Sequence, residues 1–121
     1  MIAIQGPAAA GILSTILEHP LDSIPRFSLH SQDFNGDIIW LARTGYTGED
    51  GFEVMLPPKN AEKLWRLFMD KEALSCGLGA RDTLRIEAGY PLYGHEIDQN
   101  ITPVDAGLMW AVKLLMGRSD T

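Results

Sequence analysis

Two stretches of this sequence carry side chains that could bind a ligand, and both combine charge with glycine. The first is ARTGYTGEDGFEVML, residues 42 to 56, which places Glu53 inside an apolar run. If GFEVML is extended, Phe52 and Val54 share one face and Glu53 lies on the other. A carboxylate in apolar surroundings must be paired or hydrogen-bonded, because burying it without a partner costs several kcal/mol.

The Glu53 carboxylate suits a neutral ligand with an array of N–H donors, such as an aminopyrimidine, from which it can accept two parallel hydrogen bonds. Tyr46, just before the turn, could add a ring face or a hydroxyl group. Plainer interpretations stay open. Glu53 could face solvent or pair with an arginine, and Tyr46 could be a turn residue packed on the core.

The glycines of this stretch also resemble a phosphate loop, but the chemistry does not fit. A Walker loop ends in a lysine followed by serine or threonine and leads into a helix. Here the loop has no lysine, carries Glu49 and Asp50, and precedes a predicted strand. Two carboxylates would repel a polyphosphate, so this interpretation is rejected.

The second stretch is GLGARDTLRIEAG, in which Arg81 and Arg85 are four residues apart. On a helix they lie one above the other, where like charges are unfavourable. A carboxylate ligand would relieve this repulsion, since arginine binds carboxylates in a bidentate fork. The alternative is a pair of structural salt bridges to Asp82, Glu87 or the acidic loop.

Composition indicates one soluble globular domain, because 45% of the 121 residues are hydrophobic and 21% are charged. The net charge of −6 argues against nucleic-acid partners and anionic membrane surfaces, which both require basic residues. No segment approaches the ~18 apolar residues of a membrane helix.

The lone Cys76 can form neither an internal disulfide nor a cysteine-based zinc site. YGHEID has Gln99 where H-E-x-x-H needs its second histidine, so we expect no metal site.

The elements that must position these side chains follow from periodicity and turn chemistry. We expect a strand at IAIQ, a helix opened by Gly6-Pro7 and ended by Pro20, and a hairpin turning at Asn35-Gly36. His19 continues the helical spacing of the first helix. GFEVML is a further strand.

Two more helices are expected in the second half of the chain. One is the amphipathic NAEKLWRLFMDK, with Asn60 as its cap, and the other follows Cys76 and ends near Gly89. PLYGHEIDQNITP reads as a loop, and VDAGLMWAVKLLM is open between strand and helix. This order predicts an α+β fold that resembles half of a ferredoxin-like sheet with helices packed on it.

Three ordered blocks then resemble a known family, the aminomethyltransferase or T-protein of the glycine cleavage system. They are RTGYTGEDGFE, GLGARDTLRIEAGYPLYGHEID and TPVDAGLMWAV, and the resemblance spans residues 2 to about 112. The folate-binding domains of sarcosine and dimethylglycine dehydrogenases, and a folate-binding protein of iron–sulfur cluster assembly, share parts of these blocks.

The resemblance implies a reaction and its ligands. The family takes an aminomethyl group from the lipoyl arm of the H-protein, passes its methylene to tetrahydrofolate and releases ammonia. Glu53 corresponds to the family's ligand for the pterin ring, and Tyr46 to a tyrosine near the folate. Arg81 matches a substrate-binding arginine, Arg85 is a further candidate, and their charge suits the glutamyl tail of folate.

Departures from the family suggest that residues 1–121 are an incomplete folate-binding domain. Complete T-proteins are much longer, with a key aspartate upstream and a C-terminal barrel domain. We therefore expect no catalytic residue within this chain, little or no turnover by it alone, and self-association through uncovered strand edges. The alternative is a folate-binding module without transferase chemistry. The expected compartment is the cytoplasm, or the mitochondrial matrix in a eukaryote.

Overall fold

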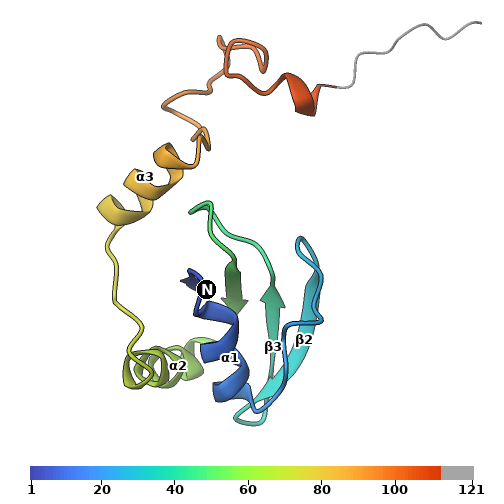
Figure 1. Ribbon diagram of the computed structural model, residues 1–121, viewed down its shortest axis with the longest axis vertical. Coiled ribbons are helices and arrows are strands. Elements are labelled where there is room, and N and C mark those ends of the chain that lie inside the picture. Colours follow the sequence, from blue (N-terminus) through green and yellow to red (C-terminus); the bar gives the residue numbers. More distant parts are fainter. Residues whose placement is uncertain (113–121) are drawn as a thin grey trace, which may run out of the picture. The chain divides into compact units, whose positions relative to one another are not determined.

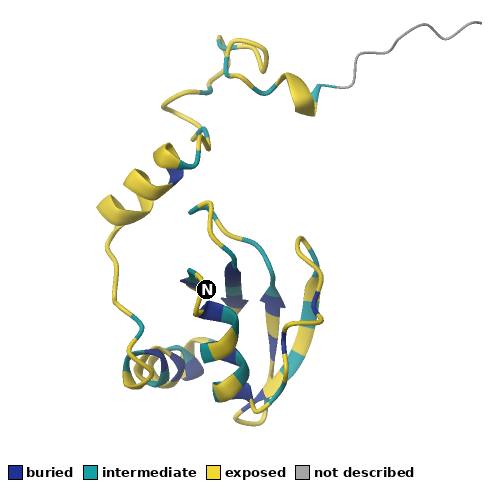
Figure 2. Cartoon of the chain, in the orientation of Figure 1, coloured by how far each residue is buried: buried dark blue, intermediate teal, exposed yellow. Residues whose placement is uncertain are grey.

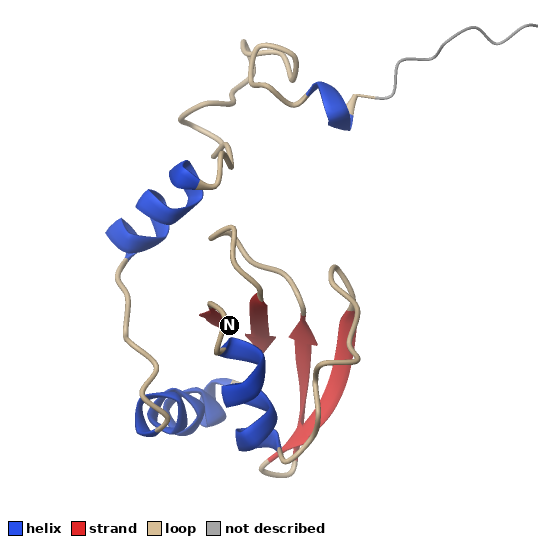
Figure 3. Ribbon diagram, in the orientation of Figure 1, coloured by secondary structure: helices blue, strands red, loops and turns tan. Residues whose placement is uncertain are grey.

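The computed structural model describes residues 1–112, in which strands and helices are mixed (Figures 1 and 3). The chain divides into two compact units, Met1–Ala88 and Gly89–Thr121. The α+β class expected from the sequence is confirmed. In chain order the elements are β1 (Ile2–Gln5), α1 (Ala9–Leu17), β2 (Leu29–Phe34), β3 (Asp37–Ala42), β4 (Gly51–Met55), α2 (Pro58–Asp70), α3 (Leu78–Glu87) and the 3-10 helix η1 (Met109–Ala111).

The first unit is built on one antiparallel sheet with the strand order β1-β4-β3-β2. β2 and β3 form the predicted hairpin, and its turn residues Asn35 and Gly36 have φ angles of 57° and 80°. Two positive φ angles fit a tight hairpin turn, which asparagine and glycine tolerate best. The two residues Asn35 and Gly36 were therefore enough to predict this turn.

The sheet differs from the expected ferredoxin-like half in the position of its first strand. In a split β-α-β unit, one strand lies between the two strands that the helix connects. Here both β4 and β3 lie between β1 and β2. The cause is β4, which turns back after β3 and pairs with β1 in the register Ile2 to Val54 and Ile4 to Phe52.

The core lies on one face of this sheet, under α1 and α2. Alternate residues of β3 and β4 point into it, and Ile39, Leu41, Phe52 and Val54 are fully buried (Figure 2). α1 and α2 supply the opposing apolar side chains. The buried apolar residues are Ile4, Ala9, Leu13, Leu17, Leu21, Ile24, Phe34, Ile39, Leu41, Phe52, Val54, Leu64 and Phe68.

The boundaries of α1 differ from those expected. The helix begins at Ala9, after a turn at Gly6 in which the Ala9 N–H donates to the Gly6 carbonyl. It ends at Leu17, before Pro20, because Glu18 takes a left-handed conformation with φ 51°. The prediction that His19 continues this helix is therefore wrong.

The predicted cap of α2 is also wrong. The helix begins at Pro58, which suits its first turn, and Asn60 lies inside it. Asn60 is 2% exposed and donates from Nδ2 to Asp37 Oδ2 at 2.9 Å, while its Oδ1 accepts from Asn35 at 3.1 Å. Its amide thus joins the helix to the hairpin turn rather than capping the helix.

α3, the third helix, agrees with its prediction and ends before Gly89.

In the second unit, residues 89–112 consist of turns, one bridge between Tyr93 and Ile97, and η1, and none of them is buried. The VDAGLMWAVKLLM run begins as turns and a 3-10 helix, and its last residues lie outside the described range. Within residues 1–112, no helix has the length and apolar character to cross a bilayer.

Candidate functional site

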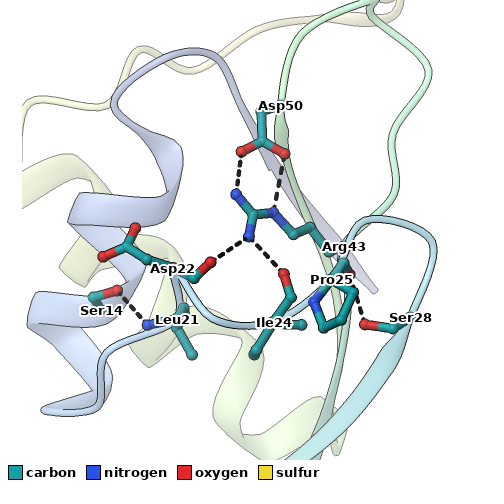
Figure 4. Close-up of polar contacts among 8 residues, drawn as sticks. All are labelled: Ser14, Leu21, Asp22, Ile24, Pro25, Ser28, Arg43 and Asp50. Atoms are coloured by element: carbon teal, nitrogen blue, oxygen red, sulfur yellow. Dashed lines mark hydrogen bonds and ion pairs between the residues drawn. The ribbon is translucent and has the colours of Figure 1, made fainter.

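The loop between β3 and β4 is closed at its base by an ion pair (Figure 4). Arg43 donates from Nε and Nη2 to the two carboxylate oxygens of Asp50, at 3.1 and 2.7 Å. Its Nη1 donates to the carbonyls of Asp22 and Ile24, at 3.1 and 2.6 Å. Arg43 therefore joins both ends of the loop to the segment that follows α1.

This pairing shifts the pKa of both groups. The hydrogen bonds from Arg43 lower the pKa of the Asp50 carboxyl below its ordinary value, although partial burial opposes the shift. The bond to Asp50 raises the pKa of Arg43 in turn. The loop is thus closed by two groups that are fully charged at neutral pH.

Gln5, at the end of β1, holds the same loop from the other side. Its Nε2 donates to the Thr44 carbonyl at 3.0 Å, and more weakly to the Phe52 carbonyl at 3.4 Å. A Cβ at Gly45 would overlap the Gln5 side chain, and a Cβ at Gly51 would overlap the Ile4 carbonyl. Gly51 is needed because β1 and β4 approach so closely there, whereas a side chain at Gly45 would displace the Gln5 amide from its hydrogen bonds.

Glu53 lies on the other sheet face from Phe52 and Val54, as the alternation predicted, and the structure shows that this face is opposite the core. It is half-buried, and its Oε2 accepts a hydrogen bond from the Thr44 hydroxyl at 2.6 Å. Its directly opposite cross-strand neighbours are Ala3 and Ala42, whose side chains are methyl groups. Among residues 1–112 it makes no ion pair. The alternative interpretation, in which Glu53 pairs with an arginine, is therefore not supported in this part of the chain.

Tyr46 and Arg81 lie together. The guanidinium carbon of Arg81, on α3, is 5.1 Å from the centroid of the Tyr46 ring, a cation–π contact. The end of α3 also approaches this loop, because a Cβ at Gly48 would meet Ala88. Tyr46 is half-buried and Arg81 is exposed, so the pair presents a positive charge to solvent beside the ring.

Arg85 differs from Arg81 although both lie on α3. Arg85 is 2% exposed, and its Nε donates to Asp82 Oδ1 at 2.7 Å. This contact is one of the salt bridges that the sequence left open. A buried arginine needs such partners to offset its desolvation. Its role in ligand binding remains a prediction.

These contacts make one short loop the centre of the candidate site. Thr44 contacts Glu53, and Tyr46, only two residues further on, contacts Arg81. The structure therefore connects Glu53, Tyr46 and Arg81 through residues 44–46. The arrangement offers a hydrogen-bond acceptor for N–H groups, an aromatic ring and a cation for an anionic group.

Sequence reasoning missed three residues of this arrangement, namely Gln5, Arg43 and Thr44. Gln5 was a weak signal as the polar end of an otherwise apolar strand. Arg43 and Thr44 directly precede the glycine-rich turn but form no motif by themselves. The hydrogen-bond partners of these three residues can be identified only once the arrangement of β1, β3 and β4 in the sheet is known.

Other groups with possible chemistry do not add to the site. The rings of His19 and His30 stack with centroids 5.8 Å apart. Within the described part of the chain, no three histidine, cysteine or acidic side chains cluster as metal ligands.

The chain is similar to known proteins over nearly all its length. Residues 1–116 match the family model described as the GCVT N-terminal domain. An aminomethyltransferase of Synechococcus elongatus is 51% identical over 114 residues, which cover 94% of this chain and 31% of that protein. One of Synechocystis sp. is 47% identical with the same coverage.

A solved structure shows the same similarity. The glycine cleavage system aminomethyltransferase T from Bartonella henselae superposes with a TM-score of 0.79 at 40% identity, covering 92% of this chain and 30% of that one. The chain thus spans about a third of the length of these relatives.

Proposed function

This chain belongs to the GCVT N-terminal domain family, and from that premise we propose that it is the folate-binding segment of a glycine cleavage aminomethyltransferase. The proposed reaction transfers the methylene of an aminomethyl group, carried on the lipoyl arm of an H-protein, to tetrahydrofolate and releases ammonia. The observation that carries the proposal is the Glu53 carboxylate, held by Thr44 between two alanines on an open sheet face.

The pterin ring of tetrahydrofolate presents an amino group and an adjacent ring N–H on one edge. A carboxylate accepts these two donors in parallel, because each of its oxygens has a free lone pair in that direction. The methyl side chains of Ala3 and Ala42 leave room beside Glu53 for a flat ring. Glu53 is therefore proposed to recognise the pterin.

The remaining site residues are proposed to hold other parts of folate. Tyr46 offers a ring face to the pterin or the aminobenzoyl group. Arg81 supplies a cation for the glutamyl carboxylates, which matters in a chain whose net charge is −6. Arg85 is proposed to support Arg81 through α3, since its Nε is engaged by Asp82.

Direct binding tests the proposal. Calorimetric titration of the 121-residue chain with tetrahydrofolate under anaerobic conditions should give a saturable heat. Glu53→Gln should weaken binding about 10- to 100-fold, the range expected when a hydrogen bond to a charged group is lost. Glu49→Gln is the matched control, because Glu49 is an exposed carboxylate of the same loop. Equal losses in both variants would contradict a specific role for Glu53.

Turnover needs more than this segment. A group transfer requires positioned reactants and a managed proton, and we assign no proton-transfer group among these residues. We therefore expect no ammonia release when the chain is mixed with aminomethyl-loaded H-protein and tetrahydrofolate. Ammonia released at the rate of a full-length relative would overturn this expectation.

A further inference from the structure

We propose that Thr44 is a positioning residue that orients the Glu53 carboxylate and so sets the selectivity of the site for an aminopyrimidine edge. The inference rests on the proposed function. Its basis is the hydrogen bond from Thr44 Oγ1 to Glu53 Oε2, which at 2.6 Å has the length of a charge-assisted O–H···O⁻ bond.

Glu53 needs an external anchor. A glutamate side chain has three rotatable bonds and loses much rotamer freedom when fixed. Its directly opposite neighbours in the sheet, Ala3 and Ala42, carry only methyl groups, which cannot hold a carboxylate in one orientation. The Thr44 hydroxyl is the hydrogen-bond donor that reaches it in the described part of the chain.

Thr44 is itself held firmly. Its carbonyl accepts from Gln5, and the preceding Arg43 is tied to Asp50 and to two further carbonyls. Threonine is also branched at Cβ, which restricts its first side-chain torsion. A hydroxyl on a fixed backbone with few rotamers is a defined donor.

The Thr44 bond leaves the carboxylate able to bind a ligand. An ionised carboxylate has about four acceptor positions, two on each oxygen. Thr44 occupies one of them on Oε2, so Oε2 keeps one and Oε1 keeps two, and each oxygen can still accept from a ligand N–H. Thr44 therefore does not compete with the pterin edge, and it selects the carboxylate rotamer that can meet both donors.

The test compares Thr44→Val, which keeps the shape but removes the hydroxyl, with Thr44→Ser, which keeps the hydroxyl. Each variant is titrated with tetrahydrofolate and with its 2-desamino-2-methyl analogue, which lacks the recognised amino group. Thr44→Val should weaken tetrahydrofolate binding about tenfold and the analogue much less, so the ratio of the two Kd values falls. Thr44→Ser should stay close to the unsubstituted chain.

Thr15→Val is the matched control, because the Thr15 hydroxyl donates to the Gly11 carbonyl on the exposed side of α1, away from the site. Thermal unfolding of each variant, followed by circular dichroism, identifies any that has lost its fold. If Thr44→Val has lost its fold, the binding of both ligands is compared between Thr44→Ser and the unsubstituted chain instead.

The outcomes separate the two proposals. If the unsubstituted chain does not bind tetrahydrofolate, the proposed function fails and this inference fails with it. If Glu53→Gln abolishes binding while Thr44→Val leaves both Kd values unchanged, the proposed function stands and the inference is overturned. Equal weakening of both ligands by Thr44→Val and Thr44→Ser would also overturn it, because that pattern indicates a structural role.

Discussion

The two faces of the same four-stranded sheet are built very differently. On the face covered by α1 and α2, Ile39, Leu41 and Phe52 are fully buried. On the opposite face, Ile38 is 59% exposed and Trp40 is 47% exposed. Apolar side chains thus occur on both faces, but only one face becomes core within residues 1–112.

This difference shows how stability and binding are divided within one set of strands. The covered face supplies the apolar burial that drives folding. The open face carries Glu53 next to Trp40 and Met55, in strands whose geometry the covered face has already fixed. A carboxylate on a rigid, partly apolar surface is a suitable position for a flat ring with N–H groups.

The largest expected effect is on the covered face. Phe52→Ala should lower the free energy of unfolding by about 3–5 kcal/mol, because it removes a fully buried ring and leaves a cavity. Urea unfolding measures the change. A loss below about 1 kcal/mol would mean that this face is not the core, and would contradict the difference between the two faces described above.

A smaller loss is expected where β1 and β4 approach each other. Gly51→Ala places a methyl group against the Ile4 carbonyl and Gln5, and overpacking of this kind costs about 1–3 kcal/mol. Since Gln5 also holds Thr44, tetrahydrofolate binding should weaken with stability. Gly11→Ala is the control, because a Cβ there meets nothing within 4 Å. Equal effects of both changes would argue against the close approach.

The loop ion pair predicts a pH dependence. Because Arg43 lowers the pKa of folded Asp50, this carboxylate stabilises the fold above its unfolded pKa of about 3.9. The contribution is lost as the pH falls through the lower, folded pKa. The stability difference between the unsubstituted chain and Asp50→Asn should therefore be largest near neutral pH and shrink in acid. Urea unfolding between pH 7 and pH 3 measures it, and a constant difference would contradict the pairing.

The smallest effect on stability is expected on the open face. Trp40→Ser should change the free energy of unfolding by no more than about 0.5 kcal/mol, as is usual for surface substitutions. The same change should reduce self-association, which the exposed apolar side chains and the sheet edges at β1 and β2 favour. Light scattering checks this, and a monomer at all concentrations before substitution would contradict the self-association prediction.

Much of the fold could be read from local patterns. The hairpin at Asn35-Gly36, the strand GFEVM and the helix after Cys76 all follow from turn chemistry and periodicity. The errors occurred where tertiary contacts override local preference. Asn60 has the side chain of a helix cap, but its amide is used by Asp37 and Asn35 of the hairpin.

The candidate site was predictable to a smaller extent. Alternation along β4 placed Glu53 on the other face from Phe52 and Val54, and helical spacing paired Arg81 with Arg85. Spacing alone could not distinguish the two arginines, since Arg85 is buried beside Asp82 while Arg81 contacts Tyr46. That distinction depends on how α3 lies against the rest of its unit.

The sequence by itself determined the order of most strands and helices, the opposite facing of Glu53 and Phe52, and the family, because each depends on the order and period of neighbouring residues. Only the tertiary structure decided that Thr44 contacts Glu53 and that Gln5 holds Thr44 from 39 residues away. Such contacts depend on strand order and loop conformation, which result from packing of the whole unit and leave no local pattern in the chain.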